Sequence, residues 1–155
     1  MKYINLTKGK TAIVDDEDFE LLSQWKWQLY SGGYARRSYR KNGKSMNVAM
    51  HRFILKLPKG LYTDHINGNR LDNRKENLRV CSYRENAYNR VKRTGTSSIF
   101  KGVYWHKHNK AWLTGIRLKE GKLKVVGYFK NEIHAAMAYD IWAKELYGEF
   151  AKLNF

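Results

Sequence analysis

The chain has 155 residues, which is enough for one ordinary domain or for two small ones, each with a buried core. Its content of 43% hydrophobic and 14% aromatic residues excludes a globally disordered protein. The 30 Lys and Arg residues against 14 Asp and Glu give a net charge of +16, so we expect a polyanionic partner, with nucleic acid as the first candidate.

Cysteine usage and the N-terminal segment narrow the cellular setting. The single cysteine, Cys81, excludes an internal disulfide framework and a Cys-rich zinc site, and it suits a reducing cytoplasm. Residues 1–10 lack the apolar segment of a signal peptide, and the chain has no run of about 18 apolar residues. We therefore expect a cytoplasmic protein without a membrane partner.

Two short apolar runs, residues 3–6 and 11–14, flank a Lys-Gly-Lys turn and predict a β-hairpin. The acidic stretch that follows predicts a short helix capped by Asp15 or Asp16, because a negative first turn suits the helix dipole. A metal-binding cluster is the alternative interpretation of these carboxylates. The residues expected to face inward are Phe19, Leu21 and Leu22.

Residues 25–30 alternate between apolar and polar side chains, which predicts a strand. Turns at 31–33 and 41–44 lead into two more strands, so we expect a small three-stranded antiparallel sheet. From Tyr34 to Gly60 the chain carries basic and no acidic side chains, which suits either a surface for a DNA backbone or an ordinary solvated sheet face. The candidate DNA contacts here are Arg36, Arg37, Arg40 and Arg52.

Residues 50–57 have apolar side chains at helical spacing and stop before Pro58, which predicts a helix. His51 falls off the apolar stripe of this helix. The sequence leaves two roles open for it. His51 either faces phosphate or holds the active-site residues in place, or it is a structural residue that makes a hydrogen bond elsewhere.

Residues 94–98 are small and polar and form the best candidate for a linker. A compact unit is expected beyond them, and its helix begins at Asn131 as the cap. The predicted elements are strands at 100–106, 111–118 and 124–129 and a helix at 131–147. The apolar stripe of this helix comprises Ala135, Tyr139, Trp142 and Leu146.

The stretch from Tyr62 to Asn89 contains the residues suited to phosphodiester hydrolysis, a reaction that needs a base, an activated water and a cation. Asp64 is a hard oxygen ligand, and the imidazole of His65 can accept a proton near neutral pH. If residues 62–66 form a strand, these two side chains point to opposite sides, so the chemistry requires a bulge or a strand end at this place.

A turn at 67–69 separates this strand from a second one at 78–81. A short helix is expected to follow, with Ser82 as its cap and Glu85 completing a capping box. Asn86 and Asn89 would share a face of that helix, and one of them can offer a carbonyl oxygen to the Asp-His pair.

The stretch resembles the HNH (ββα-metal) endonucleases, and in particular their homing-type branch from phages and introns. Asn77 follows His65 by 12 positions and Asn86 follows Asn77 by 9, as in that branch. The resemblance implies that Asp64 and Asn86 hold one Mg²⁺ or Mn²⁺ ion and that His65 is the general base. Asn77 would fix the loop and orient His65. Three polar neighbours without a firm role would contact the active-site residues rather than the substrate: His51, Asn73 and Asn89.

Residues 98–155 resemble the APETALA/ethylene-response-factor type of DNA-binding domain through FKGVYW (100–105), AWLTGIR (111–117) and VGYF (126–129). The resemblance implies a three-stranded antiparallel sheet packed on one helix, with the sheet entering the major groove of DNA. The DNA-binding candidates that it implies are Lys101, Tyr104, His106, Trp112, Arg117, Lys119 and Lys124. The plant domains carry other residues at several of these positions, so their base preference does not transfer.

Together these patterns predict an α+β protein with a small N-terminal antiparallel sheet, a central ββα-metal motif and the C-terminal sheet and helix. The predicted organisation is a nuclease region at 1–93 with its core at 50–92, a linker at 94–98 and a DNA-binding domain at 99–155. We expect a monomer that nicks one strand of double-stranded DNA in the cytoplasm of a bacterium or phage-infected host cell. The alternative is a DNA-binding transcriptional regulator with an inactive nuclease motif.

Overall fold

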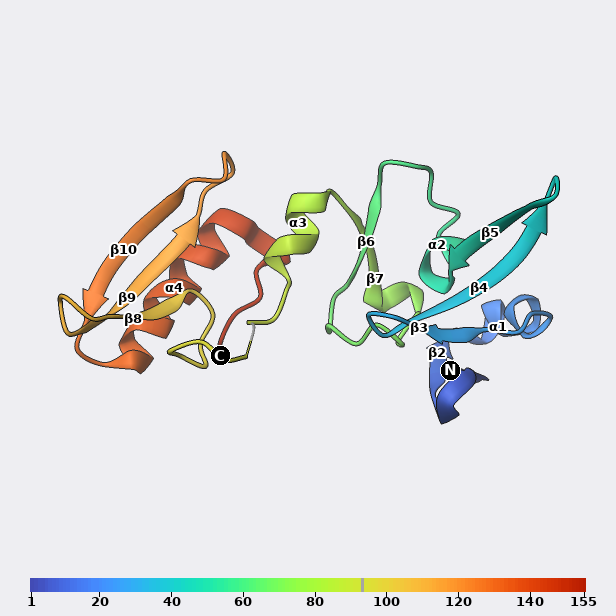
Figure 1. The fold of residues 1–155 in the computed structure, drawn as a ribbon, viewed down its shortest axis with the longest axis horizontal. Coiled ribbons are helices and arrows are strands. Elements are labelled where there is room, and N and C mark those ends of the chain that lie inside the picture. Colours follow the sequence, from blue (N-terminus) through green and yellow to red (C-terminus); the bar gives the residue numbers. More distant parts are fainter. Residues whose placement is uncertain (93) are drawn as a thin grey trace. The chain divides into compact units, whose positions relative to one another are not determined.

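A computed structural model describes residues 1–92 and 94–155 of the chain (Figure 1). The described chain forms two compact units, residues 1–86 and 87–155, and each is treated by itself. This division lies upstream of the linker predicted at 94–98, because the stretch after residue 86 packs within the C-terminal unit: the ring of Tyr88 stacks on that of Tyr147 at 3.8 Å. Arg93, the last residue of the predicted nuclease region, lies outside the described residues.

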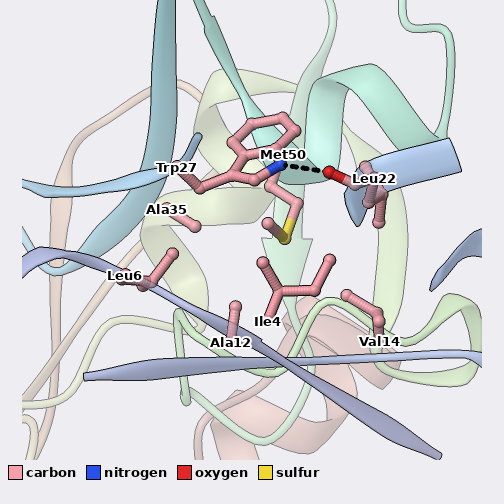
Figure 2. Packing of buried hydrophobic residues seen from close by; sticks show 8 residues of the cluster. All are labelled: Ile4, Leu6, Ala12, Val14, Leu22, Trp27, Ala35 and Met50. Atoms are coloured by element: carbon pink, nitrogen blue, oxygen red, sulfur yellow. Dashed lines mark hydrogen bonds between the residues drawn. The ribbon is translucent and has the colours of Figure 1, made fainter. Parts of the chain in front are cut away.

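The N-terminal hairpin is confirmed. Strand β1 (Lys2–Asn5) pairs antiparallel with β2 (Thr11–Val14) across a single 3₁₀ turn, η1 (Thr7–Gly9), and helix α1 (Asp16–Ser23) follows. Figure 2 shows the core above this hairpin, where the indole N–H of Trp27 donates to the carbonyl oxygen of Leu22 at 2.9 Å. The buried members of this core are Ile4, Leu6, Ala12, Val14, Leu22, Trp27, Ala35 and Met50.

Two details of the predicted first helix are wrong. Asp15 occupies the N-cap position, but its carboxylate accepts from the backbone N–H of Lys75 at 2.7 Å instead of capping α1. Leu21 is 47% exposed, whereas Leu22 is buried in the core and Phe19 packs against it, as predicted. The nearby carboxylates of Glu17 and Asp18 form ion pairs with the Lys75 ammonium group, so a cation of the chain itself compensates their charge.

The three-stranded sheet is confirmed with the order β3 (Gln28–Tyr30), β4 (Tyr34–Lys41) and β5 (Lys44–Ala49). Its first strand begins three residues later than predicted, because the indole of Trp27 turns back into the core. Helix α2 (Met50–Ile54) is also shorter than predicted and ends before Lys56, whose φ of 47° is left-handed.

The central motif is a hairpin followed by a helix. Strand β6 (Tyr62–His65) pairs antiparallel with β7 (Leu78–Cys81), and a 3₁₀ turn, η2 (Lys75–Asn77), precedes β7. Helix α3 (Tyr83–Tyr88) follows. The predicted capping box is present, because Ser82 Oγ accepts from Glu85 N at 3.2 Å and Glu85 Oε2 accepts from Ser82 N at 2.7 Å.

The C-terminal unit contains the predicted sheet and helix. Strands β8 (Val103–His106), β9 (Ala111–Arg117) and β10 (Leu123–Phe129) form an antiparallel sheet with β9 in the middle. Helix α4 (Glu132–Tyr147) packs on it, and a 3₁₀ turn, η3 (Gly148–Phe150), ends the helix. The predicted cap is confirmed, because Asn131 Oδ1 accepts from Ile133 N and His134 N.

The fold is therefore α+β, built from small antiparallel sheets and short helices, as predicted. None of the helices in residues 1–92 and 94–155 is long and apolar enough to cross a membrane.

Candidate nuclease site

The loop between β6 and β7 is fixed by a buried asparagine. Asn77 Oδ1 accepts from the backbone N–H of Asn67 at 2.9 Å, and Asn77 Nδ2 donates to the carbonyl oxygen of Asp72 at 2.8 Å. The backbone of Asn77 also accepts from Ile66 N at 2.9 Å. This one residue therefore fastens the chain directly after His65 to the chain directly before β7.

Replacing Asn77 with alanine is expected to destabilise the N-terminal unit by about 1–3 kcal/mol, because a partly buried N–H and a buried C=O lose their partners. Chemical denaturation of the full chain measures this loss. The matched control is Asn47→Ala, which removes only an exposed side-chain bond with Ser38 and should change stability by no more than about 0.5 kcal/mol. Equal effects of the two substitutions would contradict the role of Asn77.

Asp72 is a second anchor of the loop that sequence reasoning missed. Its buried carboxylate accepts from Asn67 Nδ2 at 2.9 Å and forms an ion pair with Arg74 at 2.7 Å. The hydrogen bonds from Arg74 hold the pKa of Asp72 below its usual value. The spacing of Asp72 and Arg74 is an ordinary Asx-turn signal, so the run of polar residues around it contained the clue.

His65 lies at the end of β6 and is only 4% exposed. Burial lowers its pKa, while the side chain of Asn73 and the charge of Asp64 act in the opposite direction. The ring is therefore neutral at pH 7 and able to accept a proton. Asn73, which the sequence left without a firm role, is thus the asparagine whose side chain acts on the pKa of this ring, whereas the side chain of Asn77 binds the loop.

Asp64 lies on the other side of the hairpin from His65. It is 4% exposed, and its Oδ2 accepts from Nε and Nη2 of Arg79 at 2.9 and 2.6 Å, directly across the strand pair. The strand end required by the sequence argument is present, since β6 stops at His65 and the turn begins with Gly68 N donating to His65 O at 2.8 Å. The pairing of β6 with β7 is regular and has no bulge.

Two more rings surround His65. The ring centroid of His51 is 5.2 Å away in an edge-to-face arrangement, and that of Tyr34 is 5.9 Å away. Desolvation by burial lowers the pKa of His51 to about 3. These residues come from α2 and β4, so the N-terminal sheet supplies part of the environment of the nuclease motif.

A pocket of about 370 Å³ opens beside these rings. Asn86 on α3 lines it together with Tyr34, His51 and Thr63. Asn89, which was expected to share a helix face with Asn86, lies beyond the end of α3 at Tyr88. The structure thus brings His51 and Asn86 to one pocket and leaves Asn89 outside the helix.

The four arginines predicted to contact DNA in this unit have different surroundings. Arg36 lies over the ring of Tyr30 at 3.4 Å and also lines the pocket, and Arg40 is exposed near the β4–β5 turn. Arg37 lies over the ring of Trp25 at 3.9 Å. Arg52 donates to three carbonyl oxygens of the 57–61 loop, so its guanidinium group is committed to holding that loop.

The C-terminal candidates divide between the two faces of the sheet. Tyr104, His106 and Arg117 lie on the face that α4 does not cover, opposite the helix-facing Thr114 and Ile116, and Lys119 is exposed after β9. Tyr104 is 45% exposed, and the ring of His106 lies 5.2 Å from that of Tyr128.

Three of the residues predicted to contact DNA from the C-terminal unit do not lie on the uncovered face of the sheet. Lys124 lies over the ring of Trp142 on α4 at 3.5 Å, and Trp112 packs with the buried residues beneath the helix. The Nζ of Lys101 donates to the carbonyl oxygen of Tyr88, and burial lowers its pKa to about 8. These side chains therefore pack in the interior or on the helix-covered side of the unit.

Strands β6 and β7 are antiparallel, a fixed loop joins them, and helix α3 follows. With the buried, neutral His65 at the end of β6, this arrangement defines the ββα class of nuclease motif. Residues 48–88 match the family model described as HNH endonuclease. The chain is 35% identical over 153 residues to an uncharacterized HNH endonuclease of Acanthamoeba polyphaga mimivirus, covering 95% of this chain and 76% of that protein. It is 33% identical over 99 residues to Protein 3.8 of Escherichia phage T7, covering 63% of this chain and 79% of that protein.

Among solved structures the chain is similar to one described as DNA binding and cleavage by the HNH homing endonuclease I-HmuI, with 22% identity and a TM-score of 0.38. This match covers 78% of the present chain and 64% of the other, so the chain spans less than two thirds of that protein. The chain belongs to the HNH endonuclease family, as its family model and its mimivirus relative establish.

Proposed function

We propose that the protein is a divalent-metal-dependent endonuclease that hydrolyses a phosphodiester bond in double-stranded DNA. The observation that carries the proposal is the buried, neutral His65 at the end of β6, held beside a loop that Asn77 fastens at both ends. An imidazole in this state can remove a proton from water, and the net charge of +16 favours a polyanionic substrate.

His65 would act as the general base. Its ring takes the proton of a water molecule, the water oxygen bonds to phosphorus, and the bond from phosphorus to the leaving oxygen breaks. The side chain of Asn73, which acts to raise the pKa of His65, would favour uptake of this proton. The contacts of Asn77 support the same geometry indirectly, because they fix the backbone directly after His65.

Asp64 and Asn86 would hold one Mg²⁺ or Mn²⁺ ion. The donor set fits such an ion, since both groups offer hard oxygen atoms, and Arg79 holds the buried carboxylate of Asp64 in place through Oδ2. When bound, the ion supplies charge that neutralises the phosphate oxygens and the leaving oxygen. Asp64 and His65 lie on opposite faces of one strand, so the metal ligand and the base would come from different sides of β6.

DNA would contact basic and aromatic side chains in both units. The candidates that remain accessible in the N-terminal unit are Arg36 and Arg40. In the C-terminal unit, which we propose to be an APETALA/ethylene-response-factor-like DNA-binding domain, the uncovered sheet face presents Tyr104, His106 and Arg117, with Lys119 beside it. Arginine can pair with a guanine edge, and tyrosine packs on sugars or thymine methyl groups.

The chain has one set of these catalytic residues, so a monomer would nick one strand per binding event. Double-strand cleavage would need a second copy or a second round of binding. Nicked and linear plasmid products, separated on a gel at increasing enzyme concentration, distinguish the two outcomes.

The metal assignment is tested by the Mg²⁺ concentration that gives half-maximal plasmid nicking. Asp64→Asn and Asn86→Ala should each raise this concentration by about 10- to 100-fold or abolish nicking, as loss of a metal ligand or its direct support does. The control is Asn47→Ala, on the exposed β4–β5 hairpin. An unchanged Mg²⁺ requirement in both site variants would refute this pair of ligands.

A further inference from the structure

Two polar atoms in the wall of the 370 Å³ pocket have no hydrogen-bond partner within the described part of the chain. They are Nδ1 of His51 and Oγ1 of Thr63, and both residues line the pocket. Buried polar groups are normally paired, because leaving one unpaired costs about 1–3 kcal/mol. Both atoms are sealed from solvent, so they cannot meet a ligand themselves, and any contact with one must come from other atoms of the pocket wall.

The second ring nitrogen of His51, Nε2, is the one that can meet a ligand. It makes no hydrogen bond to the described residues, and unlike Nδ1 it is not sealed from solvent. The burial that lowers the pKa of His51 to about 3 keeps the ring neutral, so one nitrogen carries a proton and the other a lone pair. A buried acceptor without a partner costs less free energy than a buried N–H without a partner. The lone pair is therefore on the buried Nδ1, and the proton is on Nε2, facing the pocket.

The remaining walls suit a nucleotide. Tyr30 and Tyr34 offer aromatic surface, and the guanidinium group of Arg36 lies 3.4 Å from the Tyr30 ring centroid at the pocket. Stacking on aromatic rings together with a nearby arginine is how proteins hold single nucleotides of a strand. The pocket volume falls at the lower end of the range of about 300–1,000 Å³ found for small-molecule sites.

We propose that this pocket binds one phosphate-bearing nucleotide of the DNA strand, with His51 Nε2–H donating to a phosphate oxygen. The proposal rests on the proposed nuclease function, because it places the nucleotide beside Asn86 and next to the ring of His65. Of the two roles that the sequence left open for His51, the geometry favours the one that faces phosphate.

The test uses the full chain in EDTA, so that no cleavage occurs, with thymidine 3′,5′-bisphosphate as the probe and amide and histidine NMR signals as the readout. The bisphosphate should shift the signals of His51, Tyr34 and Asn86, and thymidine alone should bind more weakly. His51→Phe should weaken binding by about 10- to 100-fold, since it removes a hydrogen bond to a charged group but keeps a ring. His51→Gln, which restores an N–H near the position of Nε2, should recover most of the affinity.

The matched control is His134→Phe, which changes an exposed histidine on α4 and should leave the affinity unaltered. Arg36→Gln should also weaken binding, whereas Lys44→Gln, at an exposed position on β5, should not. If His51→Phe binds the probe as the parent does, or if only exposed lysine and arginine residues respond, the pocket is not a nucleotide site. Because binding is measured without metal, it separates this proposal from the nuclease function: an inactive protein that binds the probe through His51 would refute only the latter.

Discussion

Replacing His65 with alanine is expected to slow DNA cleavage by about 10²–10⁴-fold, the usual contribution of a general base. The ring is buried at the end of β6, and burial keeps it neutral and able to accept a proton. DNA affinity should change little, because the substitution removes no charge at pH 7. Single-turnover nicking rates and binding in EDTA, measured for the same preparation, give the two quantities separately.

His134→Ala provides the control, because that histidine is exposed on α4 in the C-terminal unit. It should cleave at the rate of the parent. A His65→Ala variant that nicks DNA as fast as this control would refute the base assignment. An equal loss of DNA binding and of cleavage would show instead that the substitution damages the fold or the DNA surface.

Gly102→Ala is expected to destabilise the C-terminal unit by about 2–5 kcal/mol. A Cβ atom at this position would lie 1.9 Å from Cδ2 of the buried Tyr139, and the glycine has a φ of +77°. The left-handed backbone accounts for about 1–2 kcal/mol, and forcing the ring aside adds a cost of about 1–3 kcal/mol. Loss of the near-ultraviolet signal and of the dispersed NMR signals of residues 99–155 during denaturation measures the effect.

Gly121→Ala separates the two causes, because Gly121 has a φ of +89° but a Cβ there would meet no atom within 4 Å. It should cost only the backbone part, about 1–2 kcal/mol. If the two alanine variants are equally stable, the close approach of Tyr139 to the Gly102 backbone contributes nothing to the energetics of this unit.

Local signals predicted most of the fold. The Ser82–Glu85 capping box, the Asn131 cap and the alternating strands depend on contacts within a few residues, and the structure contains all of them. Periodicity was a poorer guide to the ends of elements. Trp27 is not part of the predicted strand, because its ring is buried and its indole N–H donates to the Leu22 carbonyl oxygen. The alternation of apolar and polar residues does not reveal this burial.

The position of Lys124 on the helix-facing side of the sheet has a specific physical cause. The pairing of β10 with β9 shifts register between Val125 and Gly127, and an extra residue in a strand reverses the face of every residue on one side of it. Lys124 therefore faces α4 and lies over Trp142, while Val125 lies on the uncovered face. Gly127 is the local signal of this bulge, since an isolated glycine within a strand often marks one, but it does not show which residues exchange faces.

The candidate site was predictable in its composition but not in its surroundings. The spacing of His65, Asn77 and Asn86 indicated the family, and that family is now established. The Asp64–Arg79 ion pair and the packing of His51 and Tyr34 around His65 depend on how separate elements meet in space. Sequence spacing does not contain that information, so the individual roles of these residues remain predictions for experiment.

The most direct test of a metal-dependent nuclease at this site is the conversion of supercoiled plasmid by the full chain in Mg²⁺ and in EDTA. We predict that Mg²⁺ gives nicked circular DNA and that EDTA prevents it while DNA binding persists. Plasmid that stays supercoiled in both Mg²⁺ and Mn²⁺, with the protein folded and bound to DNA, would contradict the account and favour a DNA-binding regulator with an inactive nuclease motif.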